Sequence, residues 1–133
     1  MRATGCEVLL VVSDGHNKGD VRYLTNHSIW SQRAYAIIAE NAGPFLCTPM
    51  VSQQYWAKLT GWATDIRSSA TPIRDAVGIL RSLMTAGQTL GISGMRGLMP
   101  LEDHEHLTAY LPDVTVRDMT DLMQSVRAVK SDE

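Results

Sequence analysis

The sequence predicts an α/β domain in which helices cover a β-sheet. Strand-like and helix-like segments alternate along the chain. Residues 6–13 are apolar nearly throughout, as in a strand that is buried on both faces, and residues 35–48 read as strand, tight turn, strand. The 133 residues have the length of one ordinary domain, which can bury a core without disulfides or metal.

Turn residues separate the predicted strands in the first third of the chain. A polar loop bracketed by glycines, residues 14–20, follows the first strand. Residues 21–25 fit either a helical turn or a short strand. The sequence Asn-Ala-Gly-Pro at 41–44 is typical of a turn and joins the second strand, residues 35–39, to its hairpin partner at 45–48.

Apolar spacing predicts two helices in the middle of the chain. Residues 50–59 carry Val51, Tyr55 and Leu59 at intervals of four, on one helix face. Thr71 and Pro72 suit a helix start, because Thr supplies an N-cap oxygen and the N–H that Pro lacks would be unpaired there. We expect Gly87 to close this second helix, whose apolar positions are Ile73, Val77, Leu80 and Met84.

The last third alternates in the same way. Residues 89–93 predict a short strand, and residues 100–110 a helix that Pro100 opens and Pro112 stops. Residues 114–117 predict the last strand. Asp118 or Thr120 then caps a final helix, whose apolar positions are Leu122, Met123, Val126 and Val129.

Composition excludes several classes of function. The formal charge is −2 and the pI is about 6.0, so the chain lacks the basic footprint of a protein that binds nucleic acid or an anionic membrane. No apolar run approaches the ~18 residues needed to span a bilayer. Cys6 and Cys47 lie in apolar runs and match no metal-ligand spacing, so we expect two buried free thiols and a reducing, cytoplasmic setting.

Motifs for metal binding and nucleophilic catalysis are weak, and we predict no catalytic residue and no metal ligand in this chain. His104 and His106 point about 200° apart on a helix and cannot share a metal. The acids around them are the types favoured near a helix N-terminus, so we interpret residues 102–106 as a solvated helix face. No serine lies in a Gly-x-Ser-x-Gly elbow. The glycines within residues 87–97 match no phosphate-binding pattern and are expected to close a helix and relax turns.

One group of aromatic and arginine residues predicts a contact role. Trp30, Arg33 and Tyr35 follow a polar stretch at the start of the second strand, and the residue types Trp and Arg are enriched in binding hot spots. Trp30 has no apolar neighbour beyond Ile29, which favours exposure. Three further members of the group lie downstream: Trp56, Trp62 and Arg67. For the two tryptophans, packing in the core or at its rim is the simpler interpretation.

Four segments together resemble a known family. Residues 5–11 (Gly-Cys-Glu-Val-Leu-Leu-Val) and 20–26 (Asp-Val-Arg-Tyr-Leu-Thr-Asn) are similar to the opening of creatinase and prolidase proteins. Residues 65–67 (Asp-Ile-Arg) match the family's Asp-hydrophobic-Arg. Residues 127–133 (Arg-Ala-Val-Lys-Ser-Asp-Glu) resemble the segment that joins the family's N-terminal domain to its pita-bread catalytic domain. The sequence departs from the family at Asn26, where Gly is usual, and in the glycine-rich region 87–97.

The resemblance implies a fold and a parent protein. The fold is a mixed sheet of about six strands flanked by helices, with ribonuclease H-like topology. The family contains Xaa-Pro aminopeptidases, prolidases and creatinases. Residues 1–133 would form one creatinase/prolidase-type N-terminal domain, excised or truncated from a longer hydrolase whose catalytic domain is absent from this chain. The parent would hold a dinuclear Mn, Co or Zn centre in that other domain, or no metal if it is creatinase-like, and this domain would need no cofactor.

The resemblance also implies partners and site residues. The domain would shape substrate access and form a homodimer, with no nucleic acid or membrane partner. Trp30 and Arg33 would contact substrate in the active site of the neighbouring subunit. The alternative is a free-standing α/β module that binds a ligand or another protein.

Overall fold

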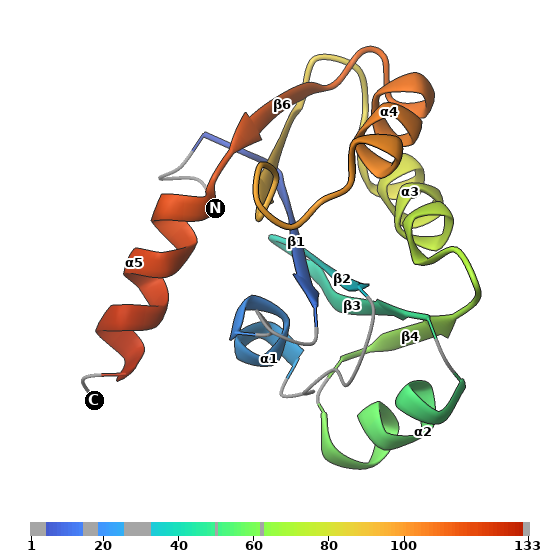
Figure 1. The fold of residues 1–133 in the computed structure, drawn as a ribbon. Coiled ribbons are helices and arrows are strands. Elements are labelled where there is room, and N and C mark those ends of the chain that lie inside the picture. The colour runs from blue at the N-terminus through green and yellow to red at the C-terminus, as the bar shows by residue number, and fades with distance from the viewer. Residues whose placement is uncertain (1–4, 15–18, 26–32, 50, 62, 132–133) are drawn as a thin grey trace.

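The structure, a computed structural model, describes residues 5–14, 19–25, 33–49, 51–61 and 63–131, and within them the chain forms one six-stranded sheet with helices on both faces (Figure 1). The strands are β1 (Val8–Asp14), β2 (Arg33–Ala39), β3 (Ala42–Thr48), β4 (Asp65–Ser68), β5 (Thr89–Ser93) and β6 (Thr115–Asp118). The helices are α1 (Gly19–Thr25), α2 (Val51–Thr60), α3 (Pro72–Leu83), α4 (Leu101–Tyr110) and α5 (Thr120–Ser131).

The sheet is mixed, as the family resemblance implied. Its strand order is β4-β3-β2-β1-β5-β6. The first three strands form an antiparallel meander, and β4, β5 and β6 each pair in parallel with their neighbour nearer the centre. The prediction of an α/β fold with a mixed sheet and helices is therefore confirmed.

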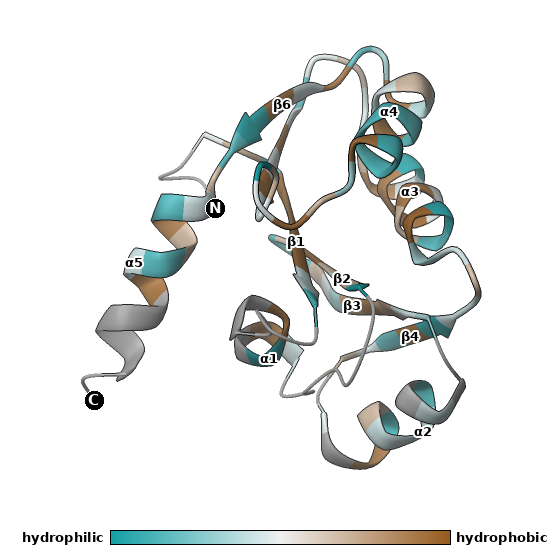
Figure 2. Cartoon of the chain, viewed as in Figure 1, coloured by the Kyte–Doolittle hydropathy of each residue, from teal (hydrophilic) through white to brown (hydrophobic). Residues whose placement is uncertain are grey.

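β1 lies in the middle of the sheet and is covered on both faces. Leu10 and Val12 belong to the apolar cluster on one face, and Val11 belongs to the cluster on the other face. Successive side chains of a strand point to opposite faces, so a strand between two layers of helices must be apolar at every position. The unbroken apolar run that predicted this strand follows from that position, and Figure 2 shows it in brown.

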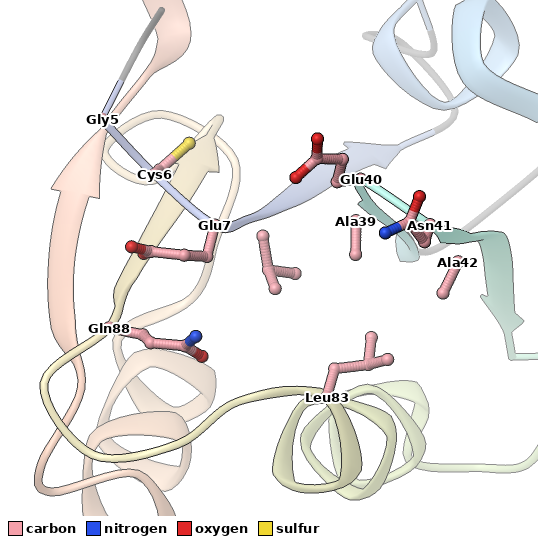
Figure 3. Close-up of a pocket in the computed structure, with 10 residues that line it drawn as sticks. Gly5, Cys6, Glu7, Ala39, Glu40, Asn41, Ala42, Leu83 and Gln88 are labelled. Atoms are coloured by element: carbon pink, nitrogen blue, oxygen red, sulfur yellow. The ribbon is translucent and has the colours of Figure 1, made fainter. Parts of the chain in front are cut away.

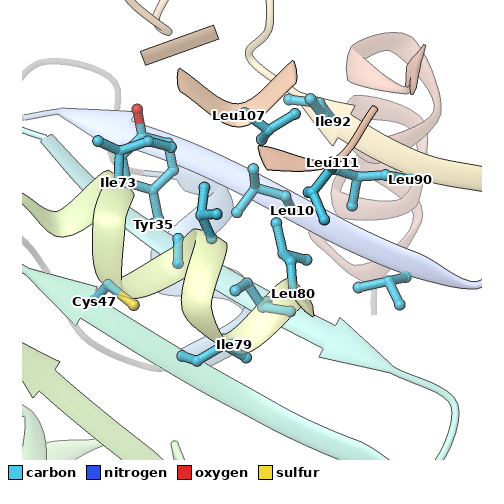
Figure 4. Close-up of a cluster of buried hydrophobic side chains, with 14 of the residues drawn as sticks. Leu10, Tyr35, Cys47, Ile73, Ile79, Leu80, Leu90, Ile92, Leu107 and Leu111 are labelled. Atoms are coloured by element: carbon cyan, nitrogen blue, oxygen red, sulfur yellow. The ribbon is translucent and has the colours of Figure 1, made fainter. Parts of the chain in front are cut away.

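The larger apolar cluster fills the space between the sheet and helices α3 and α4. Its fully buried members include Leu10 and Ile37 from the sheet, Leu80 from α3 and Leu107 from α4. Figure 4 shows Leu80 pointing from α3 into this cluster. The opposite cluster, against α1, α2 and α5, is smaller and contains three alanines: Ala34, Ala36 and Ala57.

Helix α3 confirms the predicted buried face and corrects its predicted ends. All four apolar positions named from the sequence are buried, with Leu80 fully so. Thr71 is the N-cap residue, but its side chain makes no capping hydrogen bond. The helix ends at Leu83, so Gly87 does not close it. Gly87 instead forms the following turn, with φ at +85° and its amide donating to the Asp113 carbonyl at 2.9 Å.

Helix α2 exists where predicted, but two of its three predicted apolar residues are exposed, and the side chain of the third, Val51, lies outside the described part. Tyr55 and Leu59 are both 61% exposed, and Trp56 is 47% exposed. Among the side chains of this helix that the structure describes, that of Ala57 is buried and packs against the smaller cluster. The side chain of Gln54 fastens the helix to the sheet edge by donating to the Ile66 carbonyl at 2.8 Å.

Three other elements refine the sequence prediction. Residues 21–25, which were ambiguous, belong to helix α1. Strand β4 was not predicted as a strand. Helix α5 starts at Thr120, and Asp118 caps it by accepting hydrogen bonds from the Thr120 amide at 3.1 Å and the Thr120 hydroxyl at 2.6 Å. These bonds lower the pKa of Asp118. Of the four predicted apolar residues of this helix, Met123 is buried and Leu122 and Val126 are partly exposed, while the side chain of Val129 lies outside the described part.

Glycine has a specific role at two positions around β5. Gly94 follows the strand with φ at +90°, which an L side chain rarely adopts, and an added Cβ would lie 2.6 Å from a Val12 methyl. Gly91 lies inside the strand rather than in a turn. A Cβ there would lie 2.6 Å from the Met119 side chain, so the close approach of the chain before α5 requires glycine.

Candidate functional site

Two clefts, each of about 550 Å³, lie at opposite ends of the sheet. Figure 3 shows the first, between the start of β1, the β2–β3 turn and the end of α3. Two polar side chains that line this first cleft form hydrogen bonds with the backbone and so stabilise the fold. The Glu7 carboxylate accepts a hydrogen bond from the Thr89 amide at 2.6 Å, and the Gln88 side-chain oxygen accepts one from the Thr85 amide at 2.9 Å.

The second cleft lies where β3 and β4 end, β2 begins, and helices α3 and α4 start. In open α/β sheets, ligands commonly bind outside the carboxyl ends of the strands. We call this second cleft the carboxyl-edge cleft. Its lining combines charged, polar and rigid apolar groups: Arg33, Tyr35, Pro49, Ala70, Thr71, Pro72, Ile73, Arg74, Pro100, Glu102, Asp103 and His106.

Arg33 is the one residue predicted to contact substrate that the structure describes, and it lines this cleft. It is the first residue of β2 and lies opposite Asp14 of β1. Its Nε donates a hydrogen bond to the Leu98 carbonyl at 2.8 Å. That bond fixes the plane of an exposed guanidinium and leaves the two terminal nitrogens for another partner, which is the edge that binds carboxylates in bidentate fashion.

Tyr35 forms the floor of the cleft and has a structural role. Its side chain is 1% exposed, and its hydroxyl donates a hydrogen bond to the Asp103 carboxylate. Burial and this hydrogen bond raise the pKa of Tyr35 far above its usual value, so the hydroxyl keeps its proton. The bond joins the central sheet to the first turn of α4. Asp103 therefore does not belong to a freely solvated helix face, contrary to the sequence interpretation.

Ser69 orders the turn that leads into α3, whereas the Thr71 side chain makes no capping hydrogen bond. The Ser69 hydroxyl accepts a hydrogen bond from the Thr71 amide at 3.1 Å and donates one to the Asp75 carboxylate at 2.8 Å. Within the described part of the chain, the Thr71 hydroxyl and the Arg74 guanidinium have no hydrogen-bond or ionic partner. Both groups are therefore available to a molecule in the cleft.

The two histidines of α4 separate as predicted. His106 lines the cleft and its ring lies 4.6 Å from that of Tyr110, whereas His104 does not line the cleft. No group of three or more His, Cys, Asp or Glu side chains that could hold a metal ion comes together in the ranges that the structure describes.

The other residues predicted to make contacts that the structure describes, Trp56 and Arg67, do not line the cleft. Trp30 and Trp62 lie outside the described residues. Trp56 lies on α2, edge-on to Tyr55 with ring centroids 6.0 Å apart. Arg67 pairs with Asp65 of the same strand at 3.3 Å. Arg74 and Glu102 were not predicted, although both lie in the first turn of a helix that follows a strand, and that placement is the signal that could have found them.

Both cysteines are buried free thiols, as predicted. Burial raises the pKa of the Cys47 thiol from its usual value of 9.0 to about 12. The thiolate is the nucleophilic form of cysteine, so Cys47 is an unreactive core residue at neutral pH. No helix among the described residues is long and apolar enough to cross a membrane.

Solved structures with a similar fold come from proline-specific peptidases. An X-Pro aminopeptidase from Thermotoga maritima superposes with a TM-score of 0.73 at 16% identity, over 95% of this chain and 34% of that chain. An Xaa-Pro aminopeptidase from Streptococcus thermophilus gives 0.71 at 22% identity, over 95% of this chain and 88% of that chain. The creatinase/prolidase N-terminal domain of an X-Pro dipeptidase from Streptococcus pyogenes gives 0.69 at 13% identity, over 93% and 90%.

These comparisons agree with the sequence motifs. This chain spans about a third of the length of the Thermotoga aminopeptidase chain, and nearly all of the two streptococcal chains. A comparison of the sequence with curated proteins finds no match. The family model of the creatinase/prolidase N-terminal domain matches residues 1–129, and the sheet order and the motifs agree with it. The chain therefore belongs to the creatinase/prolidase N-terminal domain family.

Proposed function

We propose that this chain is the non-catalytic N-terminal domain of an Xaa-Pro peptidase-like or creatinase-like hydrolase, in which it shapes access to the substrate. The observation that carries the proposal is the family match over residues 1–129, together with the position of Arg33. The Arg33 guanidinium is exposed at the rim of the carboxyl-edge cleft, and the hydrogen bond from its Nε to the Leu98 carbonyl fixes its orientation. A preorganised arginine loses little side-chain entropy when it binds a carboxylate.

In this proposal Trp30 and Arg33 act in trans, in the active site of the neighbouring subunit of a homodimer. The guanidinium would hold a substrate carboxylate, and the indole would cover a small cationic or apolar group. Any metal of the parent protein would be held outside the described residues of this domain, and no catalytic step is assigned to them. The two buried free thiols support a reducing, cytoplasmic location.

Steady-state kinetics of the full-length dimer test the trans contact. Arg33→Ala and Trp30→Ala should each lower kcat/KM by about tenfold or more, since each removes a contact to bound substrate. Arg81→Ala and Trp56→Ala are matched controls, because both residues are exposed and lie away from the cleft. If Arg33→Ala and Trp30→Ala keep the wild-type kcat/KM and only lower the melting temperature, both residues are structural and the trans role is wrong.

The cleft itself favours the alternative function, a ligand-binding module. It contains polar groups that have no partner in the described chain, whereas two polar side chains of the opposite cleft hold the fold together. The two functions differ in what the isolated domain can do. A binding module binds its ligand without a second domain, and that property can be measured directly.

A further inference from the structure

Two hydrogen bonds tie the start of β2 to the chain around the start of α4. The Arg33 Nε donates to the Leu98 carbonyl at 2.8 Å, and the Tyr35 hydroxyl donates to the Asp103 carboxylate. Arg33 and Tyr35 alternate with one residue of β2, so their side chains lie on the same face of the sheet. Leu98 and Asp103 lie on either side of Pro100, the N-cap residue of α4. The two bonds therefore join the same two segments of the chain.

The two bonds lie in different surroundings. Tyr35 is buried in the larger apolar cluster, so packing fixes the position of its hydroxyl (Figure 4). Arg33 is exposed, and water competes for its Nε. A long exposed side chain loses rotamer entropy when it is held in one geometry, and a single exposed contact offsets little of that loss. The Arg33 bond therefore depends on an acceptor whose position is already fixed.

The Leu98 carbonyl is held from both sides along the chain. On the N-terminal side, the Leu98 amide donates to the Gly94 carbonyl at 3.0 Å, which closes a turn directly after β5. An added Cβ at Gly94 would lie 2.6 Å from a Val12 methyl, so this turn packs closely against β1. On the C-terminal side, the bond from Tyr35 to Asp103 ties the first turn of α4 to β2, the strand that carries the arginine.

The charges around the Tyr35 hydroxyl agree with this arrangement. Burial and the hydrogen bond to Asp103 raise the pKa of Tyr35, whereas the charge of Arg33 lowers it, so the guanidinium lies within electrostatic range of the hydroxyl. No ion pair joins Asp103 to Arg33 among the described residues. The carboxylate therefore binds the hydroxyl and leaves the terminal nitrogens of the arginine to another partner.

We infer that Tyr35 and Asp103 are positioning residues for Arg33. Their hydrogen bond fixes the first turn of α4 against β2, this turn fixes the Leu98 carbonyl, and the carbonyl orients the guanidinium. The inference rests on the proposed function only for the use that is made of Arg33. The positioning itself is a property of this chain and can be measured without substrate.

The Nε–H signal of Arg33 in the NMR spectrum of the isotope-labelled 133-residue chain reports the arrangement directly. Two solved streptococcal chains are about as long as this one, which indicates that such a domain folds alone. A hydrogen-bonded N–H exchanges slowly with water. We expect the Arg33 signal, assigned by its loss in Arg33→Lys, to exchange about tenfold more slowly than that of the exposed Arg81.

Three variants test the dependence on the second bond. Tyr35→Phe and Asp103→Ala each remove that bond, and each should raise the exchange rate at the Arg33 Nε about tenfold, to that of Arg81. Asp103→Asn keeps a side-chain oxygen that accepts the Tyr35 hydroxyl, so the exchange rate should stay within about twofold of the wild-type rate.

Two control variants separate positioning from a general loss of stability. Ile37→Val loosens the larger cluster without removing either bond, and Tyr55→Phe removes an exposed hydroxyl on α2. Neither should change the exchange rate at the Arg33 Nε. The inference is overturned if the wild-type Arg33 signal exchanges as fast as that of Arg81, if Tyr35→Phe leaves it slow, or if Ile37→Val accelerates it as much as Tyr35→Phe does.

Kinetics of the full-length dimer connect the positioning to function. Because Tyr35 acts through Arg33, Tyr35→Phe should lower kcat/KM by about three- to tenfold in the wild-type background and cause no further loss in an Arg33→Ala background. Additive losses would show that Tyr35 does not act through Arg33 and would overturn the inference. An Arg33→Ala variant with wild-type kcat/KM would instead refute the trans contact, and the exchange measurement would still decide the positioning.

Discussion

Helices α2 and α3 carry similar apolar spacing in the sequence but lie in different surroundings. Leu80 of α3 is fully buried, whereas Leu59 of α2 is 61% exposed. α3 lies across the central strands and packs together with α4 against them (Figures 1 and 4). α2 lies beside the edge strand β4 and buries Ala57.

The comparison separates two properties that periodicity does not distinguish. Spacing of three or four residues shows which side chains share a helix face. It does not show whether another element covers that face, because the covering residues lie far away in the sequence. The apolar face of α3 packs against the central strands of the sheet. Helix α2 instead lies at the edge of the sheet, where the small side chain of Ala57 and the polar side chain of Gln54 make the contact.

The largest expected effect is on the buried leucine. Leu80→Ala should lower the free energy of unfolding by about 2–5 kcal/mol, because it removes buried apolar area and leaves a cavity in the larger cluster. Chemical denaturation followed by circular dichroism measures the change. An unchanged denaturation midpoint would mean that α3 does not pack through this face.

An intermediate effect is expected from the thiol beneath α3. Since its pKa is raised from 9.0 to about 12 in the folded state, the stability that depends on the protonated Cys47 is complete below pH 9.0 and is lost as pH rises towards 12. By about pH 10 the free energy of unfolding of the wild-type domain should have fallen by about 1 kcal/mol more than that of the Cys47→Ala variant. Denaturation curves of both proteins across this pH range give the difference between their free energies of unfolding. Because both proteins share all other titrating groups, the contributions of those groups cancel in this difference. Parallel pH dependences would show that the thiol is not buried as described.

The smallest effect is expected on α2. Leu59→Ala is chemically identical to Leu80→Ala, but the exposed position should limit its effect to about 0.5 kcal/mol or less. The same denaturation experiment makes the two helices directly comparable. A loss similar to that of Leu80→Ala would show that the face of α2 is covered in solution and would remove the contrast.

Strands and helices with a strong local signal could be predicted, and those without one could not. β5 was predicted with its observed bounds, and β1, β2, α4 and β6 within a few residues, because apolar runs and prolines mark them. β4 has four residues, of which Asp65, Arg67 and Ser68 are polar. An edge strand is covered on fewer sides than a central one, so it lacks the apolar run by which β1 is recognised.

The candidate site shows the same division. Arg33 could be selected because of its residue type and its position beside a strand start. Arg74 and Glu102 are ordinary charged residues in the first turns of two helices, and nothing local distinguishes them from a solvated face. They share a cleft because β3 and β4 end beside the start of β2, and the chain then turns into α3 near the start of α4.

Residue order alone established the α/β class, the buried central strand, the buried face of α3 and the family, since each depends on local spacing or on motifs in a fixed order. Strand order, the exposure of α2, the hydrogen bond from Tyr35 to Asp103 and the grouping of charges at one end of the sheet came from the folded chain. These features depend on residues far apart in sequence, such as Val8 and Leu90, which are 82 positions apart and pair between β1 and β5. Such pairs meet only when the sheet has assembled, and short-range patterns carry no record of which distant residue will be the neighbour.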